Sequence, residues 1–428
     1  MKFTTSIKDD MFYIKAHLIE EHGDSDIGPR FQGPFDDLKM TNDTVFYSYV
    51  PKKLHPDLLA MMCFHIFFPW VGNTIEFPEP VSKNLVKAIN ENCFSRFKGE
   101  IKVLNIDEDL QIYAPELANP LPSNVAISFG GGVDSTALSA IFPESPLVHE
   151  VSVEEFSDIS KRGTVILMKK LNQKYSTAIF PIQTNARNIS EPSGVTSWLA
   201  PIIPALMVSV DKGFTGVFLG TNLGTLFLKN GVEYRPAHEI LNPAKENFSS
   251  VTVPIIQASG GISQYMATKL SAEHGVIEFV TFCESGKNAT PCARCMKCLR
   301  RELMYRSINH QFPKKFPLDK FPIDTEKFLE KYNIERALKH FTPGIRQSFS
   351  HVFSTARDKM KDEFPSVLMP LATTFPPTDF MNHWPTEADE LFPDSFKSAF
   401  LPRFHLKIPY MSENELIIFR NWGSKIES

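Results

Sequence analysis

The stretch that decides the fold runs from Asn124 to Val153 and reads NVAISFGGGVDSTALSAIFPESPLVHEVSV. The apolar residues at 125–129 predict a buried strand, and the three glycines that follow predict a tight turn. A run compatible with a helix at 133–141 and a second apolar run at 147–153 complete a strand, turn, helix, strand unit. Because parallel strands need a crossover between them, this unit predicts the start of an α/β domain.

The same alternation continues along the chain. Further strands are expected at 178–182, 216–219 and 276–281, and an apolar helix is expected at about 197–212. We therefore expect a doubly wound parallel sheet with helices on both faces.

The two regions that flank this core have different sequence patterns. Residues 1–118 combine short alternating runs with two helical segments and predict an α+β module. Residues 311–428 are rich in Phe-Pro steps and predict a helical extension, with amphipathic helices at 325–341 and 345–360. The core domain is then expected to span residues 119–310.

Composition and charge argue against several classes of protein. The 428 residues carry 45 Lys+Arg against 49 Asp+Glu, a net charge of −4, which argues against a protein whose main task is to coat nucleic-acid phosphates. Segment 1–24 has scattered charges and no apolar run of a secretory signal, so we expect a cytoplasmic protein. The most apolar stretch, 58–71, is shorter than the ~20 residues of a membrane helix and predicts a buried helix.

The glycine-rich turn carries the first chemical prediction. Three glycines between a strand and a helix let backbone N–H groups converge on one point, and the helix N-terminus favours an anion there. Ser135 and Thr136 add hydroxyl groups. The segment lacks the Lys-Ser/Thr of a Walker A loop and the G-x-G-x-x-G of a dinucleotide site, and a plain tight turn is the alternative.

Four of the six cysteines form the second chemical prediction. They are spaced C-x8-C-x2-C-x2-C, a pattern in which four thiolates converge on one tetrahedral Zn²⁺, and four protein ligands make the site structural. A redox dithiol and an iron–sulfur cluster are the alternatives. The predicted ligands are Cys283, Cys292, Cys295 and Cys298.

The glycine-rich segment resembles the pyrophosphate-binding loop of the PP-loop ATP pyrophosphatases, with Gly130 where that family has Ser. The resemblance implies cleavage of Mg²⁺-bound ATP between its α and β phosphates, with adenylation of a carbonyl or carboxylate oxygen. It implies catalytic roles for Asp134 and Ser135. The residues expected to bind ATP in this segment are Ser128, Gly130, Gly131, Gly132, Val133, Asp134, Ser135 and Thr136.

His149 joins the expected ATP-binding residues on different grounds. It lies near the carboxyl end of the second predicted strand, where open α/β sheets bind ligands. A single histidine in that position is weak evidence by itself.

Within the PP-loop enzymes, the loop and the cysteine pattern together resemble those of the QueC-type 7-cyano-7-deazaguanine synthases. This resemblance covers residues 124–308. Gly220-Thr221-Asn222 is similar to that family's Gly-x-Asn segment, and Glu233-Tyr234-Arg235-Pro236 to its Asp-Cys-Arg-Pro motif. The resemblance implies that Gly220 binds ATP and that Asn222, Glu233 and Arg235 bind the substrate. A carboxylate at Glu233 matches the two donors of a guanine-like edge, although a solvated loop acid is the alternative.

This family adenylates a 7-carboxy-7-deazaguanine and lets ammonia displace AMP, and a second activation then gives a nitrile. The chain departs from the family pattern at Gly260 and Ile262, where a Lys and a Glu are missing, and no Pro-Gly-Arg-Asn segment is recognisable at 191–196. The absence of these charged residues is consistent with a reaction that stops at the amide, formed from the carboxylate and either ammonia or a macromolecular amine. The extra flanking regions are similar in kind to those of proteins in bacterial antiviral operons, where conjugation of a deazaguanine to a protein has been proposed.

The expected partners are thus a small deazaguanine-like substrate, a protein acceptor and a second copy of the chain as a homodimer, with no membrane and with nucleic acid not favoured. Two other functions stay open at this point. The chain is alternatively a tRNA-modifying PP-loop enzyme or a non-catalytic scaffold that binds ATP.

Overall fold

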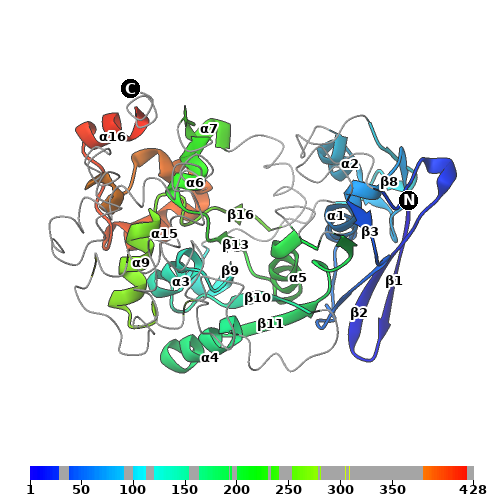
Figure 1. The fold of residues 1–428 in the computed structure, drawn as a ribbon, viewed down its shortest axis with the longest axis horizontal. Coiled ribbons are helices and arrows are strands. Elements are labelled where there is room, and N and C mark those ends of the chain that lie inside the picture. The colour runs from blue at the N-terminus through cyan, green and yellow to red at the C-terminus, as the bar shows by residue number, and fades with distance from the viewer. Residues whose placement is uncertain are drawn as a thin grey trace, which may run out of the picture.

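The computed structural model describes residues 1–27, 38–90, 100–111, 120–153, 163–191, 193–194, 200–229, 233–240, 253–277, 280, 304, 308 and 379–421. Within them the chain is an α/β structure built on a mixed sheet of eight strands (Figure 1). In spatial order the strands are β1 (Lys2–Lys8), β2 (Met11–His17), β4 (Thr44–Tyr47), β11 (Ile179–Thr184), β10 (Leu147–Ser152), β9 (Val125–Ser128), β13 (Gly216–Leu219) and β16 (Ile255–Ile256).

Five neighbouring strands, from β11 to β16, pair in parallel, as expected for the core. The sheet as a whole is mixed, because the N-terminal strands extend it with antiparallel pairing. Thr184 of β11 pairs with Tyr47 of β4, and β2 and β1 follow. The segment expected to form a separate α+β module therefore shares its main sheet with the core.

One expected strand is wrong. The described residues of the 276–281 segment, Val276, Ile277 and Val280, are not in a strand, and among the residues that the structure describes the parallel part of the sheet ends at β16. These three side chains are buried where the chain leaves helix α9 (Gln264–Glu273). Their apolar character reflects packing against the core, which periodicity alone does not distinguish from a short buried strand.

Helices cover both faces of the parallel strands. Figure 1 shows α3 (Val133–Ile141) and α9 on one side and α5 (Ile203–Lys212) on the other. Alternate residues of β9 explain this arrangement, since side chains along a strand point to opposite faces. Val125 and Ile127 belong to the hydrophobic core around α3 and α9, whereas Ala126 belongs to the core around α5.

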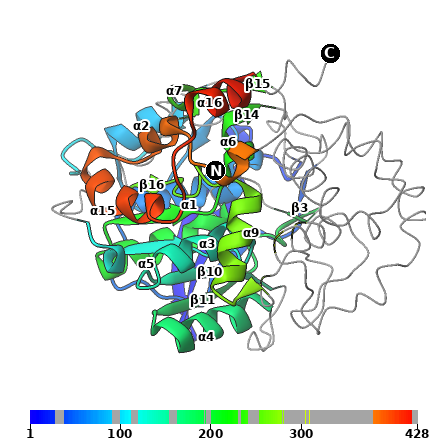
Figure 2. The ribbon, with the colours of Figure 1, turned by 90° about the vertical axis from the view of Figure 1, so that its left-hand side faces the viewer.

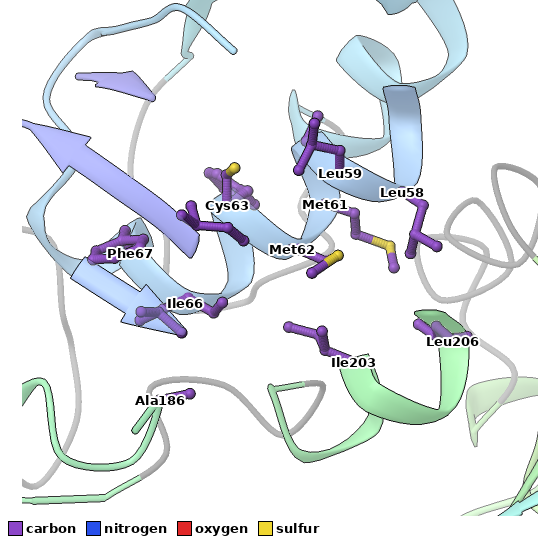
Figure 3. Close-up of a cluster of buried hydrophobic side chains, with 14 of the residues drawn as sticks. Leu58, Leu59, Met61, Met62, Cys63, Ile66, Phe67, Ala186, Ile203 and Leu206 are labelled. Atoms are coloured by element: carbon purple, nitrogen blue, oxygen red, sulfur yellow. The ribbon is translucent and has the colours of Figure 1, made fainter. Parts of the chain in front are cut away.

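The core around α5 also contains helix α1 (Pro56–Phe67), which forms most of the apolar stretch expected to be a buried helix. Figure 3 shows Met61 and Met62 of α1 directed toward Ile203 of α5. Eleven of the twelve residues of α1 are buried, which is typical of a helix enclosed by other elements rather than lying on the surface. No helix in the described ranges has the length and apolar character that crossing a membrane requires.

The core on the opposite face contains the described C-terminal residues. They form η9 (Asp379–Asn382), η10 (Thr386–Leu391), α15 (Asp394–His405) and α16 (Glu413–Arg420), and Figure 2 shows α15 and α16 on the same side of the sheet as α9. Phe400 and Phe404 of α15 meet Phe142 edge-on, with ring centroids 5.4 and 5.1 Å away. The expected helices at 325–341 and 345–360 lie outside the described residues.

Candidate functional site

The direction of the chain reverses within the parallel part of the sheet. From β9 the chain moves outward to β10 and β11, and then returns to the other side of β9 to form β13 and β16. The segments that follow β9 and β13 therefore lie side by side at the carboxyl edge of the sheet. In open α/β sheets this is the position at which ligands bind.

The glycine segment follows β9 as predicted and leads directly into α3. Gly131 has a φ of +71°, a conformation that favours glycine, and Gly132 is the N-cap of the helix. A Cβ built on Gly130 or on Gly132 would meet no atom within 4 Å. The backbone here is consequently open to a ligand, and a helix N-terminus with no side-chain cap faces it.

The two hydroxyl groups of the segment lie at the same turn. Thr136 Oγ1 donates to the carbonyl oxygen of Gly132 at 2.8 Å, and Ser135 Oγ donates to the same oxygen at 3.3 Å. Both side chains are buried. The hydroxyls thus hold the start of α3 in place, and a bound phosphate would have to compete for them.

Two separate parts of the expected site converge on the first turn of α3. The side-chain amide of Asn222 donates to Asp134 Oδ2 at 3.4 Å. Asn222 is also the N-cap of α6 (Leu223–Phe227), accepting from the backbone N–H of Thr225 at 3.1 Å. The structure therefore brings the expected catalytic carboxylate next to an expected substrate-binding residue.

Gly220 lies close to the start of α3. A Cβ on this residue would lie 2.8 Å from the backbone nitrogen of Ser135, too close for any side chain. Only glycine lets the segment after β13 pass so near the helix start. The Gly-x-Asn pattern therefore has a physical reason in this fold, with Gly220 permitting the contact and Asn222 using it.

His149 lies on β10, next to the glycine segment. Its pKa is lowered to about 4, chiefly by burial; a hydrogen bond with the Phe129 backbone partly opposes the shift, and the nearby charge of Arg187 adds to it. The imidazole is consequently neutral at neutral pH. It acts at this edge as a polar, uncharged group.

Arg187 is a cation near this edge that the sequence analysis missed. Its Nε donates to Glu150 Oε1 at 2.7 Å, and its charge also influences His149. Glu150 is buried, while the Arg187 side chain is 37% exposed. The sequence signal for Arg187 was its place three residues after β11, at the carboxyl edge of the sheet.

The expected substrate-binding segment around residue 234 forms a short hairpin from β14 (Leu228–Lys229) and β15 (Glu233–Tyr234). Arg235 does not project freely from it. Its guanidinium donates to the Leu226 carbonyl from Nε at 3.0 Å and from Nη2 at 2.5 Å. Arg235 thereby anchors the hairpin to the end of α6.

The departure around residue 260 has a packing explanation. A Cβ on Gly260 would lie 2.2 Å from Leu391 Cδ1, and one on Gly261 would lie 2.4 Å from the Trp384 ring. Both partners belong to the C-terminal residues, and both are buried. Apolar side chains from the end of the chain therefore occupy the space beside the segment that follows β16.

The four expected zinc ligands, Cys283, Cys292, Cys295 and Cys298, lie outside the described residues. Among the residues that the structure does describe, no group of three or more His, Cys, Asp or Glu side chains is arranged to hold a metal ion. The zinc site stays a prediction from the cysteine spacing.

The comparisons with known proteins include a match to a family model. The model of a family of unknown function, DUF6395, matches residues 244–423, a range that includes β16, α9 and the described C-terminal residues but begins after the glycine segment. Neither the curated proteins nor the solved structures gave a match.

Proposed function

We propose that the chain is an ATP-dependent carbon–nitrogen ligase of the PP-loop type, with the doubly wound core of that class. The observation that carries the proposal is the convergence of the glycine segment with Gly220 and Asn222 where the strand order reverses. Two segments 88 residues apart meet there at Asp134. The open backbone at Gly130 and Gly132 fits the phosphates of a nucleotide.

The reaction would proceed in two steps. A carboxylate oxygen of the substrate attacks the α-phosphorus of ATP, the bond to the β-phosphate oxygen breaks, and pyrophosphate leaves. An amine then attacks the acyl carbon and AMP departs with the carboxylate oxygen, giving an amide. N–H groups of the glycine segment and of the first turn of α3 would stabilise the charge that develops on pyrophosphate.

The remaining roles follow from position. Arg187 is the cation that would approach the phosphates, and Asp134 is the carboxylate that would hold Mg²⁺, which neutralises phosphate charge when bound. Asn222 holds Asp134 in place. His149, being neutral, would offer a hydrogen bond to the nucleotide without adding charge.

The substrate class is proposed from the resemblance of residues 233–236 to the synthase motif: a 7-carboxy-7-deazaguanine-like acid. The packing at Gly260 and Gly261 favours one amidation over nitrile synthesis, because Leu391 and Trp384 fill the space beside the segment that lacks the charged pair. Ammonia or a protein amine would serve as nucleophile. We further propose one structural Zn²⁺ on the four clustered cysteines.

The test is product analysis. Purified protein is incubated with ATP, Mg²⁺, 7-carboxy-7-deazaguanine and ammonia, and nucleotides and bases are followed by mass spectrometry. The proposal expects AMP, pyrophosphate and the amide in equal amounts. AMP without a free amide would redirect the search to a macromolecular acceptor, including tRNA, whereas binding of ATP without turnover would support a scaffold.

A further inference from the structure

The hairpin that carries the expected substrate residues is in contact with residues 379–421. We call residues 379–421 the C-terminal segment. Tyr234, which stands between Glu233 and Arg235, faces this segment through both its ring and its hydroxyl group. Since a two-stranded hairpin of this length has little stability by itself, its position depends on what holds it.

The polar part of this contact centres on one carboxylate oxygen. Tyr234 donates its hydroxyl to Glu387 Oε1 at 3.2 Å, and Arg420 donates to the same oxygen from Nε at 2.8 Å and also from Nη2. The Glu387 side chain is only 14% exposed, so water competes weakly for it. Hydrogen bonds to a charged, shielded acceptor are among the stronger ones in proteins.

The apolar part of the contact comes from aromatic rings. Tyr234 stacks on Phe227 at the end of α6, with ring centroids 6.4 Å apart. Phe419 of α16 meets both rings edge-on, with its centroid 5.7 Å from that of Tyr234. Phe419 is fully buried, so the C-terminal segment packs against the ring of Tyr234 and also binds its hydroxyl group.

Protonation favours this arrangement throughout the neutral range. Burial and the charge of Glu387 raise the pKa of Tyr234 to about 12, so its hydroxyl stays a donor. Burial alone would raise the pKa of Glu387, but hydrogen bonds from Arg420, its own backbone and Tyr234, together with the charge of Arg420, lower it. The carboxylate therefore stays ionised and accepts both donors.

We propose that Glu387 is a positioning residue, which holds the 233–235 hairpin where a substrate base would bind. This inference rests on the proposed function for the identity of the ligand, but the contact itself does not. Arg235 fixes one side of the hairpin to the Leu226 carbonyl, and Glu387 fixes the other side to the C-terminal segment. The C-terminal segment thereby sets the affinity for the substrate base without contacting the phosphates of ATP.

The experiment uses the full-length chain with Glu387→Ala, Glu387→Gln and the control Asp394→Asn. Asp394 belongs to the same segment but forms an exposed ion pair with Lys397. Hydrogen exchange is measured for peptides spanning residues 227–240 and 125–141. In Glu387→Ala we expect at least fivefold faster exchange in the first peptide and no change in the second, with Glu387→Gln intermediate and the control unchanged.

The second arm measures steady-state AMP formation with 7-carboxy-7-deazaguanine as the probe. Glu387→Ala should raise the KM for this acid at least tenfold and leave the KM for ATP within twofold, with partial rescue in Glu387→Gln. Unchanged exchange at 227–240, or an equal rise in both KM values, would overturn the positioning role. If the native chain forms no AMP, the proposed function fails, and the exchange arm still decides whether Glu387 holds the hairpin.

Discussion

Asn222 donates its side-chain amide to the Asp134 carboxylate across 3.4 Å, and this contact joins the start of α6 to the start of α3. The same amide group caps α6 through its oxygen, which accepts from Thr225. One side chain thus fixes a helix start and orients a carboxylate. The relation links the two halves of the sheet at the point where their order reverses.

Replacing Asp134 by Ala should remove catalysis while the chain stays folded. Asp134 is half-buried in the first turn of α3, so removing its short side chain should cost little packing, whereas the charge needed beside the phosphates disappears. We expect AMP formation to fall by about a hundredfold or more, with little change in melting temperature. Steady-state kinetics and calorimetry on the same preparation measure the two effects. If the variant formed AMP at the native rate, Asp134 would have no role in the mechanism.

Asn222→Asp tests the contact with Asp134 from its other side. An aspartate keeps the cap of α6, because it still accepts from the Thr225 N–H. It replaces the amide donor by a second negative charge facing Asp134. We expect slower AMP formation with α6 intact, and a variant as active as the native protein would show that the contact does not matter.

Two glycine substitutions should have opposite outcomes. Gly220→Ala places a methyl group 2.8 Å from the Ser135 backbone nitrogen and should force the two segments apart, which lowers both stability and ATP affinity. At Gly130 an added Cβ would meet no atom within 4 Å, so Gly130→Ser should keep the native stability, and under the proposed function its hydroxyl should maintain or raise ATP affinity. Calorimetry with and without ATP compares the two. Tolerance of Gly220→Ala would contradict the close approach of Gly220 to the Ser135 backbone.

His149 should make folding sensitive to acid. Its pKa is about 4 in the folded chain and 6.5 in a solvated reference, so between these values the unfolded chain takes up a proton that the folded chain does not. Stability is therefore unaffected above pH 6.5 and falls as the pH drops toward 4. His149→Asn should reduce this dependence by up to about one proton, as measured by denaturant unfolding at pH 7 and pH 5. An identical pH dependence in both proteins would argue against a buried neutral imidazole.

The cysteine prediction is tested by metal content. The native chain should contain one Zn²⁺ per molecule, and Cys295→Ser should lower both the zinc content and the melting temperature, because a structural metal contributes directly to folding. Cys63, which is fully buried in α1, supplies the control, and Cys63→Ser should leave zinc unchanged. Iron and sulfide in place of zinc would favour the cluster alternative.

The parts of the fold that the sequence predicted are those with strong local signals. β9, α3, β10 and β13 lie where the apolar runs and the glycines indicated, because each is a short buried element bounded by turn residues. Asp134 and Asn222 were assigned to the site only through family resemblance, and their contact was not predicted. Its physical cause, the reversal of strand order, is a long-range property that no local pattern contains.

The parts that the sequence did not predict depend on tertiary contacts. Nothing in residues 44–47 indicates that β4 pairs with β11, and nothing near Trp384 indicates that its ring lies against Gly261. Arg187 was missed because its position near His149 depends on the pairing of β10 with β11, which no local pattern specifies. The role of Glu387 depends on a partner 153 residues away.

The most direct test of carboxylate adenylation follows one oxygen atom. 7-Carboxy-7-deazaguanine labelled with ¹⁸O in both carboxylate oxygens is incubated with the protein, ATP, Mg²⁺ and ammonia. The ¹⁸O content of AMP and of the amide is then measured by mass spectrometry. Attack by the carboxylate on the α-phosphorus predicts one ¹⁸O in each AMP and one in the amide. Unlabelled AMP, or ADP and phosphate as the products, would contradict the proposed chemistry.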